Sequence, residues 1–358
     1  MADPTDPKHS FHELVIADVV QETADTRSFV FDVPPSLAGL FGYVSGQFLT
    51  FEIPWDGFRV RRCYSLSSAP GLDAKPKVTV KRIDRGRVSN WFNERLAKGD
   101  RIAVKPPEGL FVLRPGEQER PIVMFGGGSG ITPILSIIKT ALTKTGRKIK
   151  LVYANRDRDS IIFRDELEAW RVRYPDRLEI AHHLDAERGF MHAANAKDHF
   201  AGLEHADFYI CGPGPFMDIV ESALEERQVG RGHIFIERFV SPTDPDRAQE
   251  AAPAAPAASA TSSAPSTFVC TLEGERHEVP VKPGETLLAA ARRAGLEPSF
   301  SCEEGYCGCC MAQLKTGKVA MRTHDALTAK DLTNHWVLAC QSRLEGDEPV
   351  EIDFDATY

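Results

Sequence analysis

The chain has 358 residues, of which 42% are hydrophobic and 26% charged, with a net charge of −8 and a pI near 5.8. This composition is typical of a globular protein of two or three domains, and the acidic balance argues against nucleic acid and membrane as partners. No apolar run reaches the roughly 18 residues that span a bilayer. The N-terminal MADPTDPKHS lacks the apolar core of a signal peptide, so we expect a cytoplasmic location.

Residues 10–115 are predicted to form an antiparallel β-barrel domain. Short apolar segments alternate there with turn-forming pairs such as Pro34-Pro35 and Pro70-Gly71. The expected strands are Leu14–Val20, Ser28–Val33, Gln47–Ile53, Tyr64–Leu66, Lys77–Lys81 and Arg101–Val104.

Residues 116–240 are predicted to form an α/β domain with a parallel sheet, because short apolar strands alternate with helical stretches. The expected strands are Ile122–Phe125, Lys150–Tyr153, Leu178–Ala181 and Phe208–Ile210. The expected helices are Pro133–Thr143, Arg164–Arg173 and Phe216–Arg227.

A flexible linker is expected over residues 241–266, since 251–266 contain only Ala, Pro, Ser and Thr. The remaining residues, 267–358, carry −6 of the net charge of −8, and five of the eight cysteines cluster within the 39 residues from Cys302 to Cys340. In a chain without a secretory signal, such a cluster favours metal binding over disulfides.

Two turns after expected strands indicate a nucleotide site. The first, GGGSG at 126–130, leads into a helix for which Thr132 is the expected N-cap and Pro133 the first residue. Gly128 and Gly130 let the backbone approach a pyrophosphate at the helix N-terminus. The last glycine of G-x-G-x-x-G is missing, so a purely structural turn is the alternative.

The second turn, CGPGP at 211–215, follows the expected strand at 208–210 at the same sheet edge, where open α/β sheets bind ligands. Together the two turns resemble the pyridine-nucleotide domain of the ferredoxin–NADP reductase superfamily. In that family a cysteine at this position lies beside the nicotinamide, which implies the same for Cys211; a small buried strand-end residue is the alternative. We also expect Gly212, Pro213 and Met217 to contact the nucleotide.

The choice between NADH and NADPH depends on the loop after the strand at 150–153. An acid there favours a free ribose 2′-hydroxyl, whereas an arginine tolerates a 2′-phosphate, and this loop contains Arg156, Asp157 and Arg158. Arg156 is the expected nucleotide contact, although both arginines fit a solvated loop equally well. We favour NADH and leave NADPH open.

The tetrapeptide Arg62-Cys63-Tyr64-Ser65 indicates a flavin site. The Tyr64 ring can stack on an isoalloxazine, Arg62 can pair with phosphate, and the Ser65 hydroxyl can reach flavin N5. Alone, such a tetrapeptide is more often an ordinary strand.

The order of the following segments again resembles the reductase superfamily. The resemblance implies that Val80 and Lys81 lie along the flavin. It also implies that Gly86, Val88 and Ser89, at a helix start, bind the FAD pyrophosphate. FMN is the alternative, since some relatives use it.

The end of the reductase part, near residues 236–239, carries an acid and an aromatic side chain. In the superfamily such residues approach the isoalloxazine. The resemblance implies that Phe239 covers one flavin face and that Glu237 serves proton transfer. A surface glutamate and a core phenylalanine are the alternatives.

The C-terminal cysteines have the C-x4-C-x2-C spacing of a plant-type [2Fe–2S] site. Cys302, Cys307 and Cys310 form the loop, and Cys340 is the distant fourth ligand. The region 267–358 resembles a plant-type ferredoxin domain, an α+β β-grasp fold, with a hairpin around 273–275 and a helix over Thr286–Arg293. Structural zinc is the alternative, and Cys309 is a spare thiol or a competing ligand.

The three cofactors suggest one electron path. NAD(P)H delivers a hydride, a [2Fe–2S] centre accepts one electron, and a flavin converts between the two. The chain resembles the reductase components of multicomponent oxygenases, above all those of 3-ketosteroid 9α-hydroxylases, which serve a Rieske-type non-haem iron oxygenase. Reductases of phenylacetyl-CoA epoxidases, which serve a diiron oxygenase, are also similar. A redox sensor and a stand-alone NADH-dependent reductase are further alternatives, but each leaves motifs unused.

Overall fold

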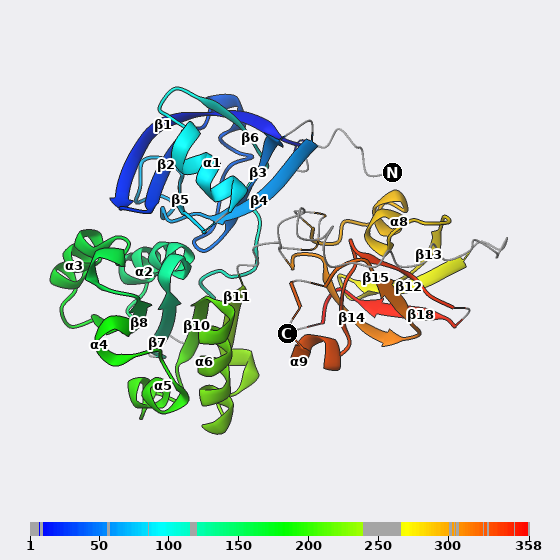
Figure 1. Cartoon of the computed structure of the whole chain (residues 1–358). Coiled ribbons are helices and arrows are strands. Elements are labelled where there is room, and N and C mark those ends of the chain that lie inside the picture. Colours follow the sequence, from blue (N-terminus) through cyan, green and yellow to red (C-terminus); the bar gives the residue numbers. More distant parts are fainter. Residues whose placement is uncertain are drawn as a thin grey trace. The chain divides into compact units, whose positions relative to one another are not determined.

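The chain divides into two compact units, one over Ser10–Phe239 and one that contains the residues from 240 onward. Figure 1 shows the computed structural model with its elements labelled. The structure describes residues 7, 10–55, 58–84, 86–114, 120–238, 266–300, 303, 305, 308–324, 326–327, 329–346 and 348–356.

The first unit begins with a six-stranded antiparallel barrel in the order β4-β3-β6-β1-β2-β5. A bridge between Leu66 and Val78 joins the two edges of the sheet. Aromatic rings fill the barrel: Phe92, from helix α1 (Arg87–Arg95), packs edge-on against Phe29 and Phe51. The strands are β1 (His12–Thr23), β2 (Thr26–Asp32), β3 (Phe48–Trp55), β4 (Phe58–Ser65), β5 (Lys77–Lys81) and β6 (Arg101–Val104); η2 (Pro35–Leu37) is a short 3₁₀ helix.

Strand β4 differs most from its prediction, because the sequence indicated only Tyr64–Leu66 and the strand covers Phe58–Ser65. Its arginines interrupt the alternation of apolar and polar residues by which a strand is predicted from sequence. The pairing with β3 explains them in part: Arg61 stands opposite Glu52, and Arg61 Nε lies 3.4 Å from Glu52 Oε1. A cross-strand ion pair of this kind stabilises a sheet without apolar alternation.

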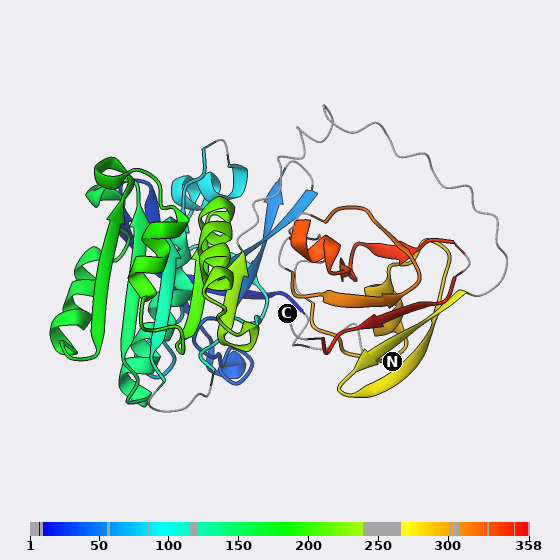
Figure 2. The same ribbon diagram turned by 90° about the horizontal axis from the view of Figure 1, so that it is seen from below.

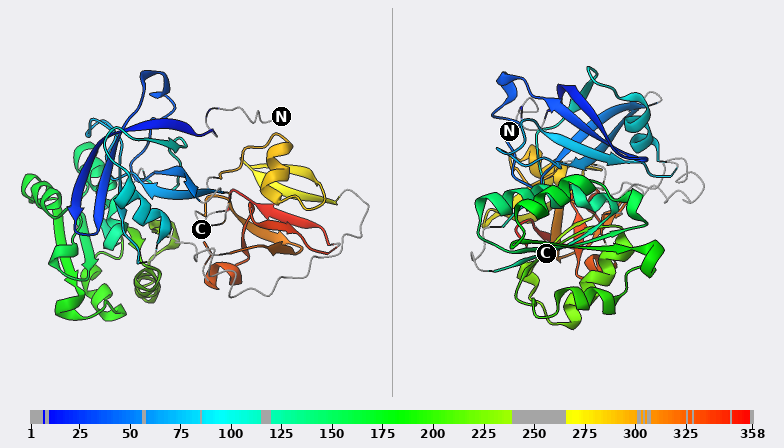
Figure 3. Two further views of the ribbon diagram at one scale, coloured as in Figure 1. Left: turned by 45° about the horizontal axis from the view of Figure 1, so that its top comes forward. Right: turned by 90° about the vertical axis from the view of Figure 1, so that its left-hand side faces the viewer.

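The unit continues with a five-stranded parallel sheet in the order β11-β10-β7-β8-β9. Helices α2 and α3 pack on one face, and α5 and α6 on the other, as the right panel of Figure 3 shows. The strands are β7 (Ile122–Gly127), β8 (Ile149–Asn155), β9 (Leu178–Leu184), β10 (Asp207–Gly212) and β11 (Ile234–Arg238). The helices are α2 (Ile131–Lys144), α3 (Arg164–Arg173), α4 (Asp185–Arg188), α5 (Ala193–Phe200) and α6 (Gly214–Glu226), with short 3₁₀ turns η3 (Gly128–Gly130), η4 (Arg158–Ser160) and η5 (Arg231–His233).

The start of helix α2 corrects one expectation. Thr132 is not its N-cap and Pro133 is not its first residue, because the helix begins at Ile131 with Gly130 as N-cap. The 3₁₀ turn η3 runs directly into the helix. Thr132 therefore lies inside the first turn, where its hydroxyl donates to the carbonyl oxygen of Ser129 at 3.0 Å.

A buried ionic network joins the barrel to the α/β domain. Lys139 of α2 is only 3% exposed, and its Nζ lies 2.8 Å from Asp73 in the β4–β5 loop and 2.6 Å from Glu166 on α3. Lys77 of β5 adds a second cation, 3.5 Å from Glu166. A buried charge is stable only when it is paired, so this network holds the two domains in one arrangement.

The second unit contains a mixed five-stranded sheet in the order β13-β12-β18-β14-β16, with a separate pair β15-β17. In Figure 2 the yellow hairpin, the red β18 and the orange β14 follow one another in this order. The hairpin predicted around 273–275 is confirmed, and Thr286 is the N-cap of α8 rather than its first residue. The elements are β12 (Ser266–Leu272), β13 (Glu275–Val281), α8 (Leu287–Arg293), β14 (Met311–Thr316), β15 (Val319–Met321), α9 (Ala329–Thr333), β16 (Trp336–Leu338), β17 (Ser342–Leu344) and β18 (Val350–Asp353).

Candidate functional site

The two turns predicted to bind nucleotide pack directly against each other. A Cβ atom on Gly130 would lie 2.1 Å from the carbonyl oxygen of Cys211, so only glycine fits there. A Cβ on Gly212 would lie 3.0 Å from the backbone of Gly127. The backbones of the two turns thus lie in direct contact at the carboxyl edge of the sheet, and the Phe216 ring packs beside Gly127 and Gly212.

The glycine-rich turn is also held from a strand. Gly128 has a φ of +51°, a conformation that glycine adopts readily. Its carbonyl oxygen accepts a hydrogen bond from the Tyr153 hydroxyl at 3.0 Å. Tyr153 was not among the predicted site residues, because nothing in the sequence of a buried strand distinguishes a tyrosine that supports a turn from one that fills the core.

Cys211 lies at the centre of this edge. It is completely buried and stands opposite Gly126 in β7 and Glu237 in β11. Burial, and then the charge of Glu237, raise the pKa of the Cys211 thiol well above its usual value, so the thiol is neutral at physiological pH. The structure therefore brings Cys211 and Glu237 together, while Phe239 lies outside the described residues.

The other residues predicted to bind the nucleotide differ in how far their side chains are exposed. Pro213 is the N-cap of α6 and is exposed, whereas the Met217 side chain is 1% exposed and lies in the core below. Met217 therefore supports the site by packing in the core, and its side chain is not accessible to a ligand. Arg156 lies after β8 with its side chain 69% exposed.

The flavin tetrapeptide forms the end of β4. Ser65 is 2% exposed, and its Oγ has no hydrogen-bond partner among the described residues. A buried hydroxyl without a partner is costly, so this atom is suited to a bound group. The Tyr64 ring packs edge-on against Phe92, with centroids 5.1 Å apart, and the Arg62 side chain donates to the Arg61 carbonyl at 2.7 Å.

The segments that follow surround the start of α1. The side chains of Val80 and Val88 lie in the barrel core, which leaves only their backbones for a ligand. Gly86 is the N-cap, and a Cβ there would lie 2.7 Å from Ser89 Oγ. Ser89 Oγ accepts a hydrogen bond from the Ile83 N–H at 3.1 Å and so shapes the loop before the helix.

Lys81 connects the flavin half of the site to the nucleotide half. Its Nζ lies 4.0 Å from the position that a Cβ on Gly128 would take. Asp25, in the β1–β2 turn, lies 3.8 Å from Lys81 and 3.9 Å from Arg156. Burial opposes the ionisation of Asp25, but hydrogen bonds from Thr23 and Thr26 and the charge of Lys81 lower its pKa, so it is a carboxylate at neutral pH. Asp25 was not among the predicted site residues, because only the tertiary fold brings the β1–β2 turn close to Arg156, which follows strand β8 of the parallel sheet.

The structure describes two of the four cysteines expected to bind iron. Cys302 and Cys307 lie outside the described residues. Cys310 and Cys340 are 3% and 7% exposed, and the Cys340 N–H donates to Cys310 Sγ at 3.5 Å. Cys309 is only half buried. The structure thus brings together two of the four expected ligands.

Comparison with protein families defines the class of this protein. The model of the oxidoreductase FAD-binding domain matches residues 13–113, and that of the oxidoreductase NAD-binding domain matches 124–222. The model of the 2Fe-2S iron-sulfur cluster binding domain matches residues 270–345. The protein is therefore an electron-transferring oxidoreductase with FAD-, NAD- and [2Fe–2S]-binding domains, which confirms the three cofactor predictions. The domain boundaries given from the sequence stay predictions.

Similarity over the whole chain gives the family. The ferredoxin reductase component of 3-ketosteroid-9-alpha-monooxygenase from Rhodococcus rhodochrous is 41% identical, over 95% of this chain and 96% of that protein. A component of 1,2-phenylacetyl-CoA epoxidase from Escherichia coli K12 is 32% identical, over 97% of this chain and 98% of that protein. The chain belongs to the family of reductase components of oxygenases.

A solved structure supports the same arrangement of domains. Phthalate dioxygenase reductase, described as modular for electron transfer from pyridine nucleotides to [2Fe–2S], is 26% identical with a TM-score of 0.60, over 96% of this chain and 97% of that chain. The predicted fold class, a flavin barrel, a parallel-sheet nucleotide domain and a ferredoxin domain, is confirmed. Among the described residues, no helix is long and apolar enough to cross a membrane.

Proposed function

We propose that this reductase passes electrons from NADH through FAD and a [2Fe–2S] cluster to a Rieske-type non-haem iron oxygenase. The observation that carries the proposal is the position of Lys81 at the end of strand β5. Its Nζ lies 4.0 Å from the place that a Cβ on Gly128, in the glycine-rich turn, would take. A hydride moves only between atoms held about 3.5 Å apart, so the two binding segments have to adjoin. A bound flavin supplies the conversion between hydride and single-electron chemistry.

The barrel residues hold the flavin in this proposal. Ser65 Oγ, which is buried without a hydrogen-bond partner among the described residues, donates to the N5 edge, and Tyr64 and Arg62 contact the ring and the phosphate. Val80 and Lys81 lie along the flavin. The backbone at Gly86, Val88 and Ser89 binds the pyrophosphate of FAD, since α1 begins there and presents free N–H groups.

The α/β domain binds the nucleotide. The N–H groups at Gly128, Gly130 and Thr132 face its pyrophosphate at the start of α2. The nicotinamide lies beside Cys211, Gly212 and Pro213, with Met217 packed below. The neutral Cys211 thiol would exclude water beside the nicotinamide, Glu237 would hold a proton for exchange, and Phe239, outside the described residues, would cover the flavin.

Asp25 supports NADH over NADPH. Its carboxylate lies within 4.0 Å of both Lys81 and Arg156, and Arg156 belongs to the loop predicted to face the ribose. A 2′-phosphate would bring further negative charge beside this acid and would compete with it for Arg156. A free 2′-hydroxyl brings no such repulsion.

The cluster ligands in this proposal are Cys302, Cys307, Cys310 and Cys340. The hydrogen bond from the Cys340 N–H to Cys310 Sγ supports Cys310, rather than the half-buried Cys309, as the third ligand. A thiolate that accepts backbone N–H bonds is stabilised against protonation.

The partner proposed is a Rieske-type oxygenase that acts on a steroid, because the 41% identical relative is named for a 3-ketosteroid monooxygenase. The 32% identity with an epoxidase component favours a diiron oxygenase as the second candidate. A cytoplasmic location accompanies either partner, since reduced nucleotide and reduced thiols are available there.

Purified protein tests the proposal. We expect FAD and one two-iron cluster per chain, NADH-dependent reduction of ferricyanide, and hydroxylation when a Rieske-type ketosteroid oxygenase is added. One zinc and no iron, or no flavin, would exclude the proposed path. Turnover with a diiron oxygenase alone would establish the second candidate.

A further inference from the structure

The residue after the fourth proposed cluster ligand is buried and makes contacts that the proposed function does not use. Gln341 is 3% exposed and lies between Cys340 and β17. Its Nε2 lies 3.2 Å from Cys340 Sγ and 3.0 Å from the carbonyl oxygen of Glu303. The side-chain amide thus faces a sulfur atom that the proposed function assigns to the cluster.

A neighbouring arginine fixes the orientation of this amide. Arg322 Nε donates to Gln341 Oε1 at 3.0 Å. A guanidinium has no acceptor, so the amide oxygen has to face Arg322 and the two N–H groups face the carbonyl and the sulfur. A flipped amide would place its oxygen against two acceptors and its N–H groups against a cation. The N–H···S contact therefore follows from the chemistry of the three neighbours.

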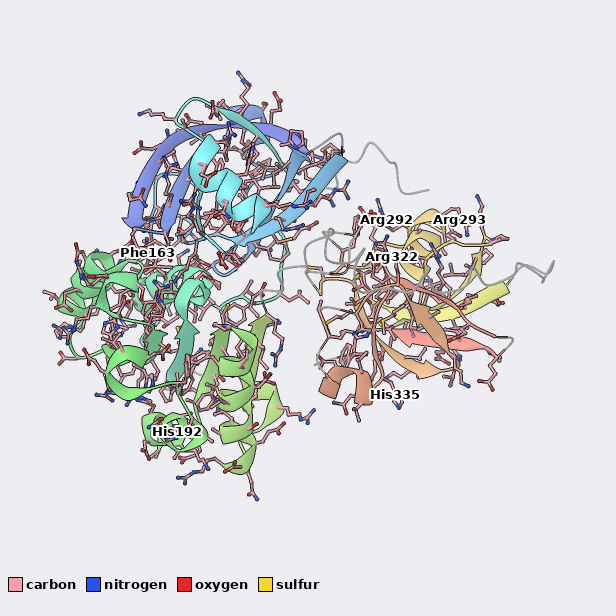
Figure 4. The ribbon with its side chains drawn as sticks, in the orientation of Figure 1. Phe163, His192, Arg292, Arg293, Arg322 and His335 are labelled. Atoms are coloured by element: carbon pink, nitrogen blue, oxygen red, sulfur yellow. The ribbon has the colours of Figure 1, made fainter. Side chains whose placement is uncertain are left out.

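Glu303 and Gly305, the described residues between Cys302 and Cys307, lie against the same glutamine. Gly305 has a φ of +87°, and a Cβ there would lie 3.0 Å from Gln341 Cγ. Glu303 is held from its other side by Arg292, whose Nη1 lies 3.3 Å from the carboxylate. Figure 4 labels Arg292 and Arg322 at the same end of this domain. Gln341 is therefore anchored on both sides of the contact with sulfur.

We propose that Gln341 tunes the cluster: its amide N–H donates to the Cys340 thiolate and stabilises the reduced form, while Arg322 positions the amide. The inference rests on the proposed function, because it takes Cys340 as a ligand. Reduction adds one electron, lost by the flavin, and breaks no bond. An N–H donor offsets the added negative charge on sulfur, which raises the reduction potential and favours transfer from flavin to cluster.

Removal of the donor from the full-length holoprotein tests the proposal. Gln341→Leu should keep two irons and the visible spectrum, and should lower the midpoint potential of the cluster in an equilibrium titration. We expect about a tenfold lower equilibrium constant for reduction, which corresponds to about 59 mV for one electron. The matched control is Gln313→Leu on β14, which removes an amide that donates to the Asn334 carbonyl rather than to sulfur and should leave the potential unchanged.

A second variant keeps the test decisive if the first assembles poorly. In Gln341→Glu the carboxylate still accepts from Arg322 but presents oxygen to the sulfur, so the potential should fall further than in Gln341→Leu. Potentials equal to wild type in either variant with intact iron would overturn the proposal. Loss of iron from both variants, while Gln313→Leu retains it, would mean a role in assembly and would also overturn it.

A double-mutant cycle tests the positioning role of Arg322. Arg322→Gln removes both a charge and the hydrogen bond to the amide. The effect of the charge is the same in wild type and in Gln341→Leu, whereas the effect on amide orientation exists only where Gln341 is present. We therefore expect Arg322→Gln to lower the potential more in wild type than in Gln341→Leu; equal shifts would exclude the positioning role.

Two controls separate this proposal from the proposed function. Wild-type protein without iron, or a cluster retained in Cys340→Ala, would contradict the ligand assignment itself. A wild-type cluster that depends on Cys340 but is insensitive to Gln341→Leu would contradict only the tuning role.

Discussion

The two units of this protein build their cofactor sites in different ways. In Ser10–Phe239 the predicted sites depend on backbones in close approach, as at Gly130 and Cys211. Within this unit, the ionic network of the buried Lys139 holds the barrel against the α/β domain. In the C-terminal unit, side chains such as Gln341 and Arg322 hold the loop. Hydride transfer requires reacting atoms within about 3.5 Å, whereas single-electron transfer lacks this demand. A rigid pair of domains therefore suits the first step, and a separately folded unit suits the second.

The largest expected effect concerns the cluster ligands. Cys310→Ala should lose the iron and the visible absorption of the cluster, because it removes a buried thiolate. Cys309→Ala should keep both, since Cys309 is half buried and outside the proposed set. Iron analysis and visible spectra decide this, and the opposite pattern would reassign the third ligand to Cys309.

The next effect concerns the backbone contact in the first unit. Gly130→Ala should reduce NADH-dependent ferricyanide reduction by roughly a hundredfold or more, because its Cβ would meet the Cys211 carbonyl at 2.1 Å and backbone atoms cannot move aside cheaply. The control is Gly232→Ala, where the added Cβ has no neighbour within 4 Å. Nearly normal steady-state turnover in Gly130→Ala would contradict the packed arrangement of the two turns.

A smaller effect concerns the interface between barrel and α/β domain. Lys139→Met should destabilise the first unit by about 1–3 kcal/mol, a range reduced because Asp73 and Glu166 are partly exposed. Flavin reduction by NADH should also slow, about tenfold, in stopped-flow traces. Lys144→Met, at the exposed end of the same helix, is the control. Unchanged hydride transfer in a destabilised Lys139 variant would limit the network to a structural role.

The smallest effect concerns the choice of nucleotide. Asp25→Asn should lower the NADH-to-NADPH ratio of kcat/KM by about fivefold, which corresponds to about 1 kcal/mol for a partly exposed charge. Since the pKa of Asp25 is lowered, the wild-type preference should not change across the neutral pH range and should weaken only in acid, as the carboxylate gains a proton. Asp32→Asn, which removes an acid paired with Lys75 on the same barrel, is the control.

Local patterns predicted most of the fold and indicated most of the residues proposed for the candidate site. The three-cysteine loop at 302–310, the two glycine turns and the RCYS tetrapeptide each lie within one turn or strand, so the sequence alone displays them. The roles of Lys139 and Asp25 could not be predicted, because their partners lie far away in the chain; Lys139 and Asp73 are 66 residues apart.

Local interactions explain the other differences between the predicted and the observed structure. A 3₁₀ turn of glycines moved the start of α2 from the expected Pro133 to Ile131. The ion pair between Glu303 and Arg292 is a further contact that the sequence did not predict. A contact of that kind depends on how the loop folds over the helix, which spacing alone does not reveal.

In the proposed electron path, hydride chemistry belongs to the first unit and delivery of electrons to the second. The most direct test of this path is oxygenase-coupled product formation by a chain truncated after Val240, measured beside ferricyanide reduction by the same sample. We predict that the truncated protein binds FAD and reduces ferricyanide with NADH but supports no oxygenase turnover. Oxygenase turnover by the truncated protein without the ferredoxin domain would contradict the proposed electron path.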